Sequence, residues 1–88
     1  MEYEELRDEM AEGYVIGDTG PLGSLTGVSR AGKFMGDFNS MTEAVRWIYK
    51  DMNAKKYWPN VFYVNDHGNV ELLRIYKNGR YRYIEGWV

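Results

Sequence analysis

The chain contains no cysteine and only one histidine, His67. Without cysteine it can form neither a disulfide nor a thiolate metal site. A single histidine in a polar turn has no second histidine with which to hold an ion, so we expect no metal and no cofactor. The sequence also lacks an apolar run of membrane-spanning length and a basic, apolar leader. These absences predict a cytoplasmic protein that does not contact a membrane.

Catalytic groupings are absent as well, and two short motifs that suggest an enzyme are incomplete. Asp18-Thr19-Gly20 matches the triplet of aspartic proteases, but the apolar segments that should frame it are missing. Residues 27–33 fit the first seven positions of a phosphate-binding P-loop, yet Phe34 stands where that loop needs Ser or Thr. No carboxylates cluster beside a recognisable nucleophile. We therefore predict that the protein is not an enzyme.

Charge is close to balanced overall but unevenly distributed. The chain has 11 basic and 13 acidic residues and a net charge of −2, which argues against a dedicated nucleic-acid binder. Six acids and one arginine lie in residues 1–12, whereas residues 74–82 contain four basic residues and no acid. Eight tyrosines provide ring area with a polar tip, which suits a binding surface as well as a small core.

Residues 38–55 contain the clearest secondary-structure signal, an amphipathic helix with its own start. Ser40 and Glu43 form a capping box in which each side chain reaches the backbone amide of the other residue. Pro59 ensures that the helix has ended. Trp47 falls outside the apolar stripe, so we expect it to be covered by a loop or to lie on a partner surface. The stripe predicted to face the core consists of Met41, Ala44, Val45, Ile48, Tyr49 and Met52.

Eighty-eight residues suffice for one domain with a modest core. We divide residues 1–88 into an acidic helix (1–13), a glycine-rich loop with short strands (14–38), the central helix (40–56) and antiparallel strands (60–88). Within the second part we expect a short strand at 14–16 and a hairpin that turns at residues 30–33. The conformation of residues 17–27 stays open. The fold class is α+β, with the central helix packed on a mixed or antiparallel sheet that ends in a three-strand meander.

Two segments carry resemblances to known proteins. The junction at residues 36–40, followed by Glu43 and Ala44, resembles the passage from sheet to helix in AP2-type DNA-binding domains, and the likeness covers residues 27–49. The Arg and Trp residues with which that family reads bases have no clear counterparts here, so no contact residues are carried over. Residues 59–70 resemble a segment of small uncharacterised proteins from tailed phages of actinobacteria. That resemblance implies a phage product that takes over a host function by binding a host protein.

Asn78-Gly79 is the strongest turn signal and predicts a two-residue hairpin loop. With that loop Tyr76 faces Tyr81 and Arg74 faces Tyr83 across the two strands. One face of the hairpin is then apolar, and the other gathers tyrosine and arginine. Together with Trp47, the residues of the predicted binding surface are Arg74, Tyr76, Arg80, Tyr81, Arg82 and Tyr83.

This aromatic and basic surface allows more than one function. Tyr and Arg dominate the energetics of protein interfaces, which favours a non-enzymatic interaction protein that binds a host protein. The same residues can stack bases and contact phosphates, so nucleic-acid binding through the hairpin is the alternative. The acidic helix at residues 1–13 could instead cover the basic hairpin. Self-association through the last strand or through Trp47 is a further possibility.

Overall fold

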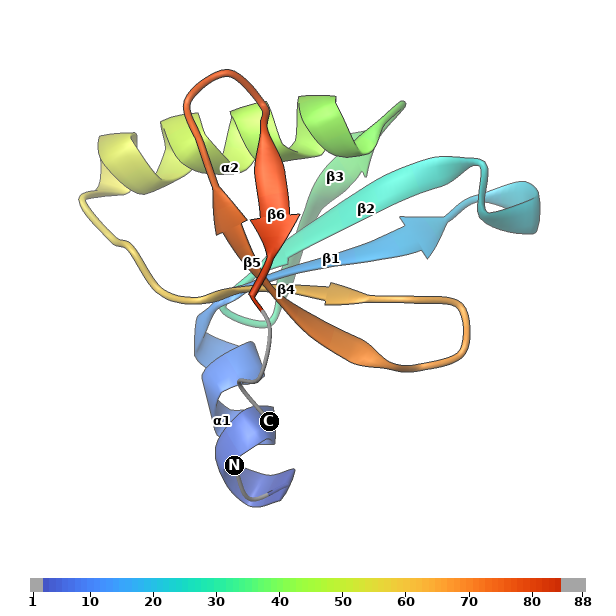
Figure 1. Cartoon of the computed structure of the whole chain (residues 1–88), viewed down its shortest axis with the longest axis horizontal. Helices are drawn as coiled ribbons and strands as arrows, with labels where there is room; N and C mark the ends of the chain where they lie inside the picture. The colour runs from blue at the N-terminus through green and yellow to red at the C-terminus, as the bar shows by residue number, and fades with distance from the viewer. Residues whose placement is uncertain (1–2, 85–88) are drawn as a thin grey trace.

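The computed structural model describes residues 3–84, with only the backbone of Tyr3 and Glu4, so residues 1–2 and 85–88 of the predicted domain lie outside it. Two α-helices, six strands and one short 3₁₀ helix follow one another along this part of the chain (Figure 1). This arrangement confirms the predicted α+β single domain. The elements are α1 (Tyr3–Glu12), β1 (Tyr14–Thr19), η1 (Pro21–Gly23), β2 (Leu25–Arg30), β3 (Lys33–Phe38), α2 (Met41–Lys55), β4 (Val61–Val64), β5 (Val70–Ile75) and β6 (Tyr81–Tyr83).

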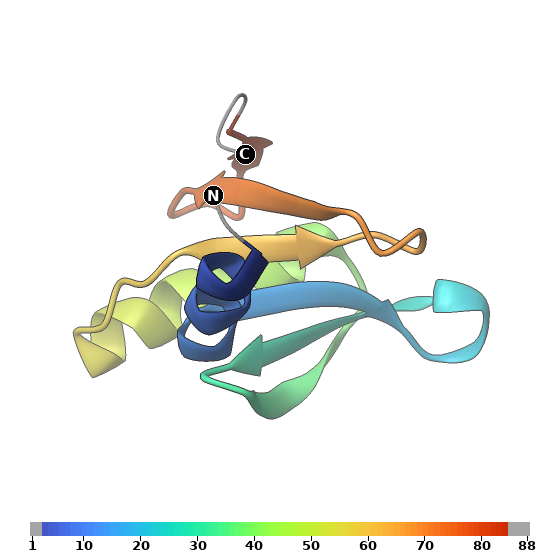
Figure 2. The same ribbon diagram turned by 90° about the horizontal axis from the view of Figure 1, so that it is seen from below.

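All six strands belong to one sheet in the order β3-β2-β1-β4-β5-β6 (Figure 2). Neighbouring strands are antiparallel except at the centre, where β1 and β4 run parallel with Tyr14 opposite Val61. Strands β1 and β4 are parallel because α2 is a crossover helix, which returns the chain so that β4 runs in the same direction as β3 and β1. The sheet is therefore mixed, with a three-strand meander on each side of one parallel pair.

The two helices lie on opposite faces of the sheet (Figure 1). Helix α2 buries Ala44, Val45, Ile48 and Met52, as its predicted stripe requires. On the other face, Leu6 and Met10 of α1 lie beside Val64 and Val70, far from α2. No helix within residues 3–84 is long and apolar enough to cross a bilayer. The strand residues that complete the core beneath α2 are Tyr14, Ile16, Val28, Val61 and Leu73.

The predicted start of α2 is confirmed, with one difference in the cap. The Ser40 hydroxyl accepts a hydrogen bond from the Glu43 amide at 3.2 Å. The Glu43 carboxylate accepts from the amide of Asn39 at 3.1 Å, and not from that of Ser40 as the capping box predicts. At the other end Lys56 adopts a left-handed conformation, and its amide donates to the Met52 carbonyl. Both ends of the helix are therefore satisfied locally.

Removal of the Ser40 hydroxyl tests this cap. We expect Ser40→Ala to lower the free energy of unfolding by about 1 kcal/mol, because the Glu43 amide loses its acceptor. Urea denaturation measures the change. Ser24→Ala, an exposed serine after η1, is the control and should change stability by less than about 0.5 kcal/mol. Equal losses in both variants would contradict a role for the cap.

A polar contact ties the middle of α2 to the sheet. The Asp51 carboxylate accepts a hydrogen bond from the Tyr14 hydroxyl at 2.6 Å and one from the Arg30 guanidinium at 2.7 Å. Partial burial opposes ionisation of Asp51, but these two donors outweigh it, so the pKa of Asp51 lies below its ordinary value. Burial and the Asp51 carboxylate also raise the pKa of Tyr14, which stays a neutral donor. The three groups join α2, β1 and β2.

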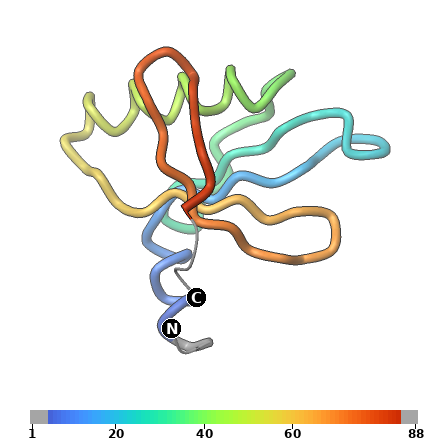
Figure 3. Tube along the Cα trace, in the orientation of Figure 1, coloured from blue at the N-terminus to red at the C-terminus, as the bar shows by residue number. Residues whose placement is uncertain are grey.

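A second contact places the β5–β6 turn against the first half of α2 (Figure 3). Gly79 is buried there with φ of 81°, and a Cβ at this position would lie 2.8 Å from the Thr42 carbonyl oxygen. The Arg46 guanidinium Nε donates to the Asn78 carbonyl at 3.4 Å. The turn is thus fixed on the helix, and the ribbon that it closes stands beside the second half of α2.

Candidate functional site: a basic groove beside α2

The β5–β6 hairpin has a different register from the predicted one. Leu73 pairs with Tyr83 and Ile75 with Tyr81, one residue away from the predicted partners. The reason is the loop, because Tyr76 donates to the Arg80 carbonyl and Gly79 donates to the Tyr76 carbonyl. Gly79 in the left-handed conformation therefore closes a three-residue loop, the arrangement with a bulge, where Asn-Gly predicted a two-residue loop.

This shift separates the residues that the sequence groups on one face. Opposed residues of an antiparallel pair share a face, so Tyr81 and Tyr83 lie on the α2 side of the sheet. Arg74 and Arg82 are opposed to one another and lie on the other side. The predicted single face of tyrosine and arginine is therefore wrong, because a one-residue slip moves each side chain to the opposite face.

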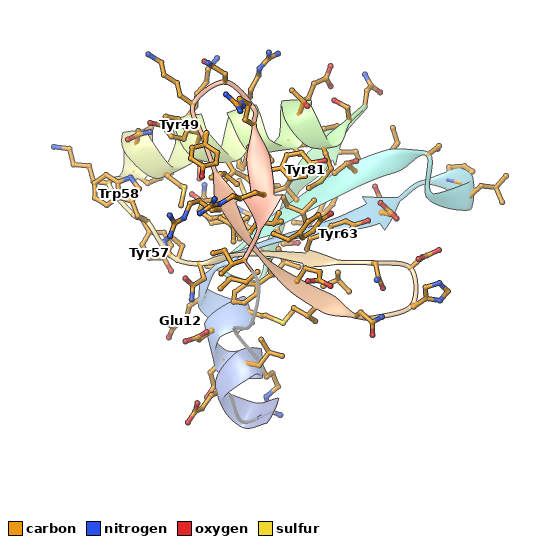
Figure 4. The ribbon with its side chains drawn as sticks, in the orientation of Figure 1. Glu12, Tyr49, Tyr57, Trp58, Tyr63 and Tyr81 are labelled. Carbon is orange, nitrogen blue, oxygen red and sulfur yellow. The ribbon has the colours of Figure 1, made fainter. Side chains whose placement is uncertain are left out.

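The hairpin borders a groove that residues from both of its faces line, Ile75 and Tyr81 from one and Arg74 and Arg82 from the other. Three adjoining hollows of about 760, 500 and 650 Å³ lie between this ribbon, the second half of α2 and the chain that leads to β4. Tyr49 lines all three, and Figure 4 shows its ring between α2 and the ribbon with Trp58 nearby on the same side. We call this surface the basic groove, and its rings and cations are Arg46, Tyr49, Lys50, Trp58, Arg74, Tyr76, Lys77, Arg80, Tyr81 and Arg82.

The charge of the basic groove is of one sign. Six of the 11 Lys and Arg residues of the chain line it, and no Asp or Glu does. Within residues 3–84 none of these six cations forms an ion pair, and the acidic helix α1 packs elsewhere, beside Val64 and Val70. The positive potential is therefore not neutralised within the described structure, and it attracts anions.

Aromatic rings accompany the cations. Trp58 is 63% exposed and Tyr76 is 40% exposed, values that are high for side chains of this size. Tyr49 is half-buried and shares one hollow with Trp58 and another with Tyr76, so it lies between them. The three rings thus follow one another along the groove.

Two residues of the predicted surface lie outside the basic groove. Tyr83 lines a separate hollow on the α2 side of the sheet. Trp47 is half-buried and packs on Phe38 with ring centroids 5.8 Å apart. Trp47 therefore joins the edge of the core, and the prediction that it leaves the apolar stripe is wrong. Self-association through β6 stays a prediction.

Sequence reasoning missed three features of the groove. It placed Tyr49 within the core stripe, whereas the ring lies at the edge of that stripe and is half exposed to the groove. It assigned no role to Arg46 and Lys50, which lie opposite the apolar stripe of α2. Trp58 carried a usable signal, because it stands immediately before Pro59. The residue before a proline is disfavoured in a helix, so Trp58 had to lie beyond the end of α2.

The groups of the groove are suited to binding anions. Guanidinium and ammonium groups can hold phosphates or carboxylates, but no carboxylate or imidazole lines the groove to move a proton. Among residues 3–84 no cluster of three or more His, Asp or Glu side chains is placed to hold a metal ion. The arrangement suits the recognition of an anionic partner that also offers flat or apolar groups.

Comparisons with known proteins assign no family to this chain. A scan against models of protein families, a search of curated proteins and a search of solved structures each found no match. The resemblances of residues 27–49 and 59–70 therefore stay predictions. Function has to be argued from the basic groove.

Proposed function

We propose that the protein is a non-enzymatic binding module whose basic groove takes single-stranded nucleic acid. The observation that carries this proposal is the lining itself, which within residues 3–84 consists of six cations without an ion pair and four aromatic rings, with no acid among them. Proteins that bind single strands combine a positive groove for the phosphates with rings on which bases stack. Arg74, Arg82 and Arg80 supply the charge on the ribbon side, and Lys50 supplies it on the helix side.

The rings favour a single strand over a duplex. Bases in a duplex are stacked on one another and present only their edges, so Trp58 and Tyr76 would find no flat partner. An unpaired strand exposes both faces of each base. Stacking is also tolerant of sequence, so we expect weak preference among bases.

An acidic surface of a host protein is the second candidate. It is favoured by the hollow around Trp58, where Pro59, Leu73 and Ile84 add apolar area beside Arg74. Exposed Trp, Tyr and Arg are the side chains that most often dominate protein interfaces. The phage setting and the cytoplasmic location inferred from the sequence agree with either partner and stay predictions.

Binding of a fluorescent oligonucleotide, followed by anisotropy at several salt concentrations, tests the proposal. We expect affinity to fall steeply with salt, since each phosphate contact contributes a slope of about −0.7 in log K against log salt for a single strand. The double variant Arg74→Ala/Arg82→Ala should reduce that slope. Trp58→Ala should weaken binding about 5- to 100-fold at every salt concentration, because one stacked base is lost.

Matched controls separate the two candidates. Arg7→Ala/Lys33→Ala removes the same charge outside the basic groove and should leave binding within about twofold. The same oligonucleotide annealed into a duplex should bind more weakly than the single strand. A polyglutamate probe that binds while the oligonucleotide does not would move the assignment to an acidic protein partner.

A further inference from the structure

The α2 side of the hairpin carries a second, separate hollow. Tyr63, Asn65, Glu71 and Tyr83 line it, and its volume is about 350 Å³, at the small end of ligand pockets. The rings of Tyr63 and Tyr83 have centroids 6.4 Å apart and are inclined by 58°. None of these four residues lines the basic groove, and in Figure 4 Tyr63 lies away from Tyr49 and Trp58. This hollow is therefore distinct from the basic groove.

A third ring supports the wall. Tyr81 meets Tyr83 edge to face, with centroids 6.3 Å apart and an angle of 89°. Tyr81 itself packs on the core, so Tyr83 has a firm neighbour although it is 47% exposed. Two inclined rings thus line the hollow, and Tyr81 supports that of Tyr83.

The surroundings of this hollow are negative. Glu71 lines it, and the Tyr63 hydroxyl donates to the Asp18 carboxylate at 3.4 Å. No Lys or Arg lines it. Burial, followed by Asp18, raises the pKa of Tyr63, and burial, followed by Tyr81 and Glu71, raises that of Tyr83. Burial opposes a charge of either sign, but the nearby carboxylates of Asp18 and Glu71 make the local potential negative, which favours a cation.

We propose that the hollow between Tyr63 and Tyr83 binds a quaternary ammonium headgroup. The negative face of each ring attracts a cation, and Glu71 adds a full charge at the wall. A primary ammonium is a compact, strongly hydrated charge, and this open hollow offers few acceptors to replace its water. A quaternary ammonium loses less hydration and contacts the rings through its methyl groups. Choline and trimethyllysine both carry this headgroup.

Titration with choline, observed by the ring proton signals of Tyr63 and Tyr83, tests the site. We expect saturable shifts in the millimolar range and an upfield shift of the choline methyl protons. 3,3-Dimethylbutanol is the control, because it has the same shape without the charge, and it should cause no saturable shift. A trimethyllysine peptide is the second probe, and tighter binding of either probe supports the site and identifies the source of the headgroup.

Three variants assign the binding to the proposed residues. Glu71→Gln should weaken choline binding about fivefold, the effect of removing one nearby charge in a partly exposed site. Tyr83→Leu should abolish binding, while Tyr83→Phe, which keeps the ring, should retain it. Asp8→Asn, an exposed acid of α1 on the other face of the sheet, should have no effect. The proposal is overturned if the neutral alcohol shifts the same signals as choline, or if Glu71→Gln binds choline like the unmodified chain.

Discussion

Replacing Gly79 with alanine is expected to lower the free energy of unfolding by about 3 kcal/mol, a large part of the stability of a domain of this size. Two costs add. A non-glycine residue at φ of 81° costs about 1 kcal/mol, and the new Cβ would lie 2.6 Å from the Thr42 methyl group and 2.8 Å from the Thr42 carbonyl oxygen. Because that oxygen belongs to the backbone of α2, the turn has to lift away from the helix.

Gly68→Ala is the matched control. Gly68 has the same φ of 81°, its amide also donates to the carbonyl three residues earlier, and no atom would lie within 4 Å of its Cβ. It should cost only the backbone term, about 1 kcal/mol. Thermal unfolding of the two variants gives the difference directly, at about 4–8 °C per kcal/mol for a domain of this length. Equal melting temperatures would show that the turn is not packed on α2.

Replacing Asp51 with alanine is expected to cost about 2–3 kcal/mol at pH 7, the largest effect among the acidic side chains of residues 5–84. The substitution leaves the buried Tyr14 hydroxyl and the Arg30 guanidinium without their acceptor. Tyr14→Phe removes one donor and keeps the ion pair, so it should cost about 1 kcal/mol. Asp8→Ala, an exposed acid of α1, should change stability by less than about 0.5 kcal/mol.

The effect of Asp51 depends on pH with a defined sign. Its pKa is lower in the folded protein than in the unfolded chain, where it is about 3.9. Its contribution is therefore complete above about pH 5 and is lost as the pH falls through the folded value. Urea unfolding at a series of pH values should show the unmodified protein and Asp51→Ala converging in acid. A gap of constant size from neutral pH to acid would assign the loss to packing and not to charge.

Local signals predicted most of the elements. Ser40 marks the start of α2, Pro59 follows its end, and the four β formers after residue 60 are β4. The hairpin at residues 25–38 also forms, because Ala31 and Gly32 both adopt the positive φ that its tight turn requires. These features depend on residues that are neighbours in the sequence, so they can be predicted from one sequence alone.

Features set by distant contacts could not be predicted in this way. The Asn78-Gly79 loop takes its three-residue form while packed against Thr42, which the hairpin sequence does not contain. The predicted loop after Ile16 is instead strand as far as Thr19, because β2 pairs with all of these residues and β4 pairs with Gly17 on the other side. The candidate site was predicted only in part for the same reason. Its basic residues could be found from the composition of residues 74–82, but the face on which each side chain lies depends on the register of the β5–β6 hairpin.

The parallel pair at the centre of the sheet has a consequence for how the protein is made. Strand β1 precedes β2, β3 and the whole of α2 in the chain, and one of its two partners, β4, is synthesised only after them. During synthesis an inner strand is thus an open edge, the kind of surface to which other extended chains attach. Rapid synthesis of residues 20–64, or a companion that shields residues 14–17, limits that exposure.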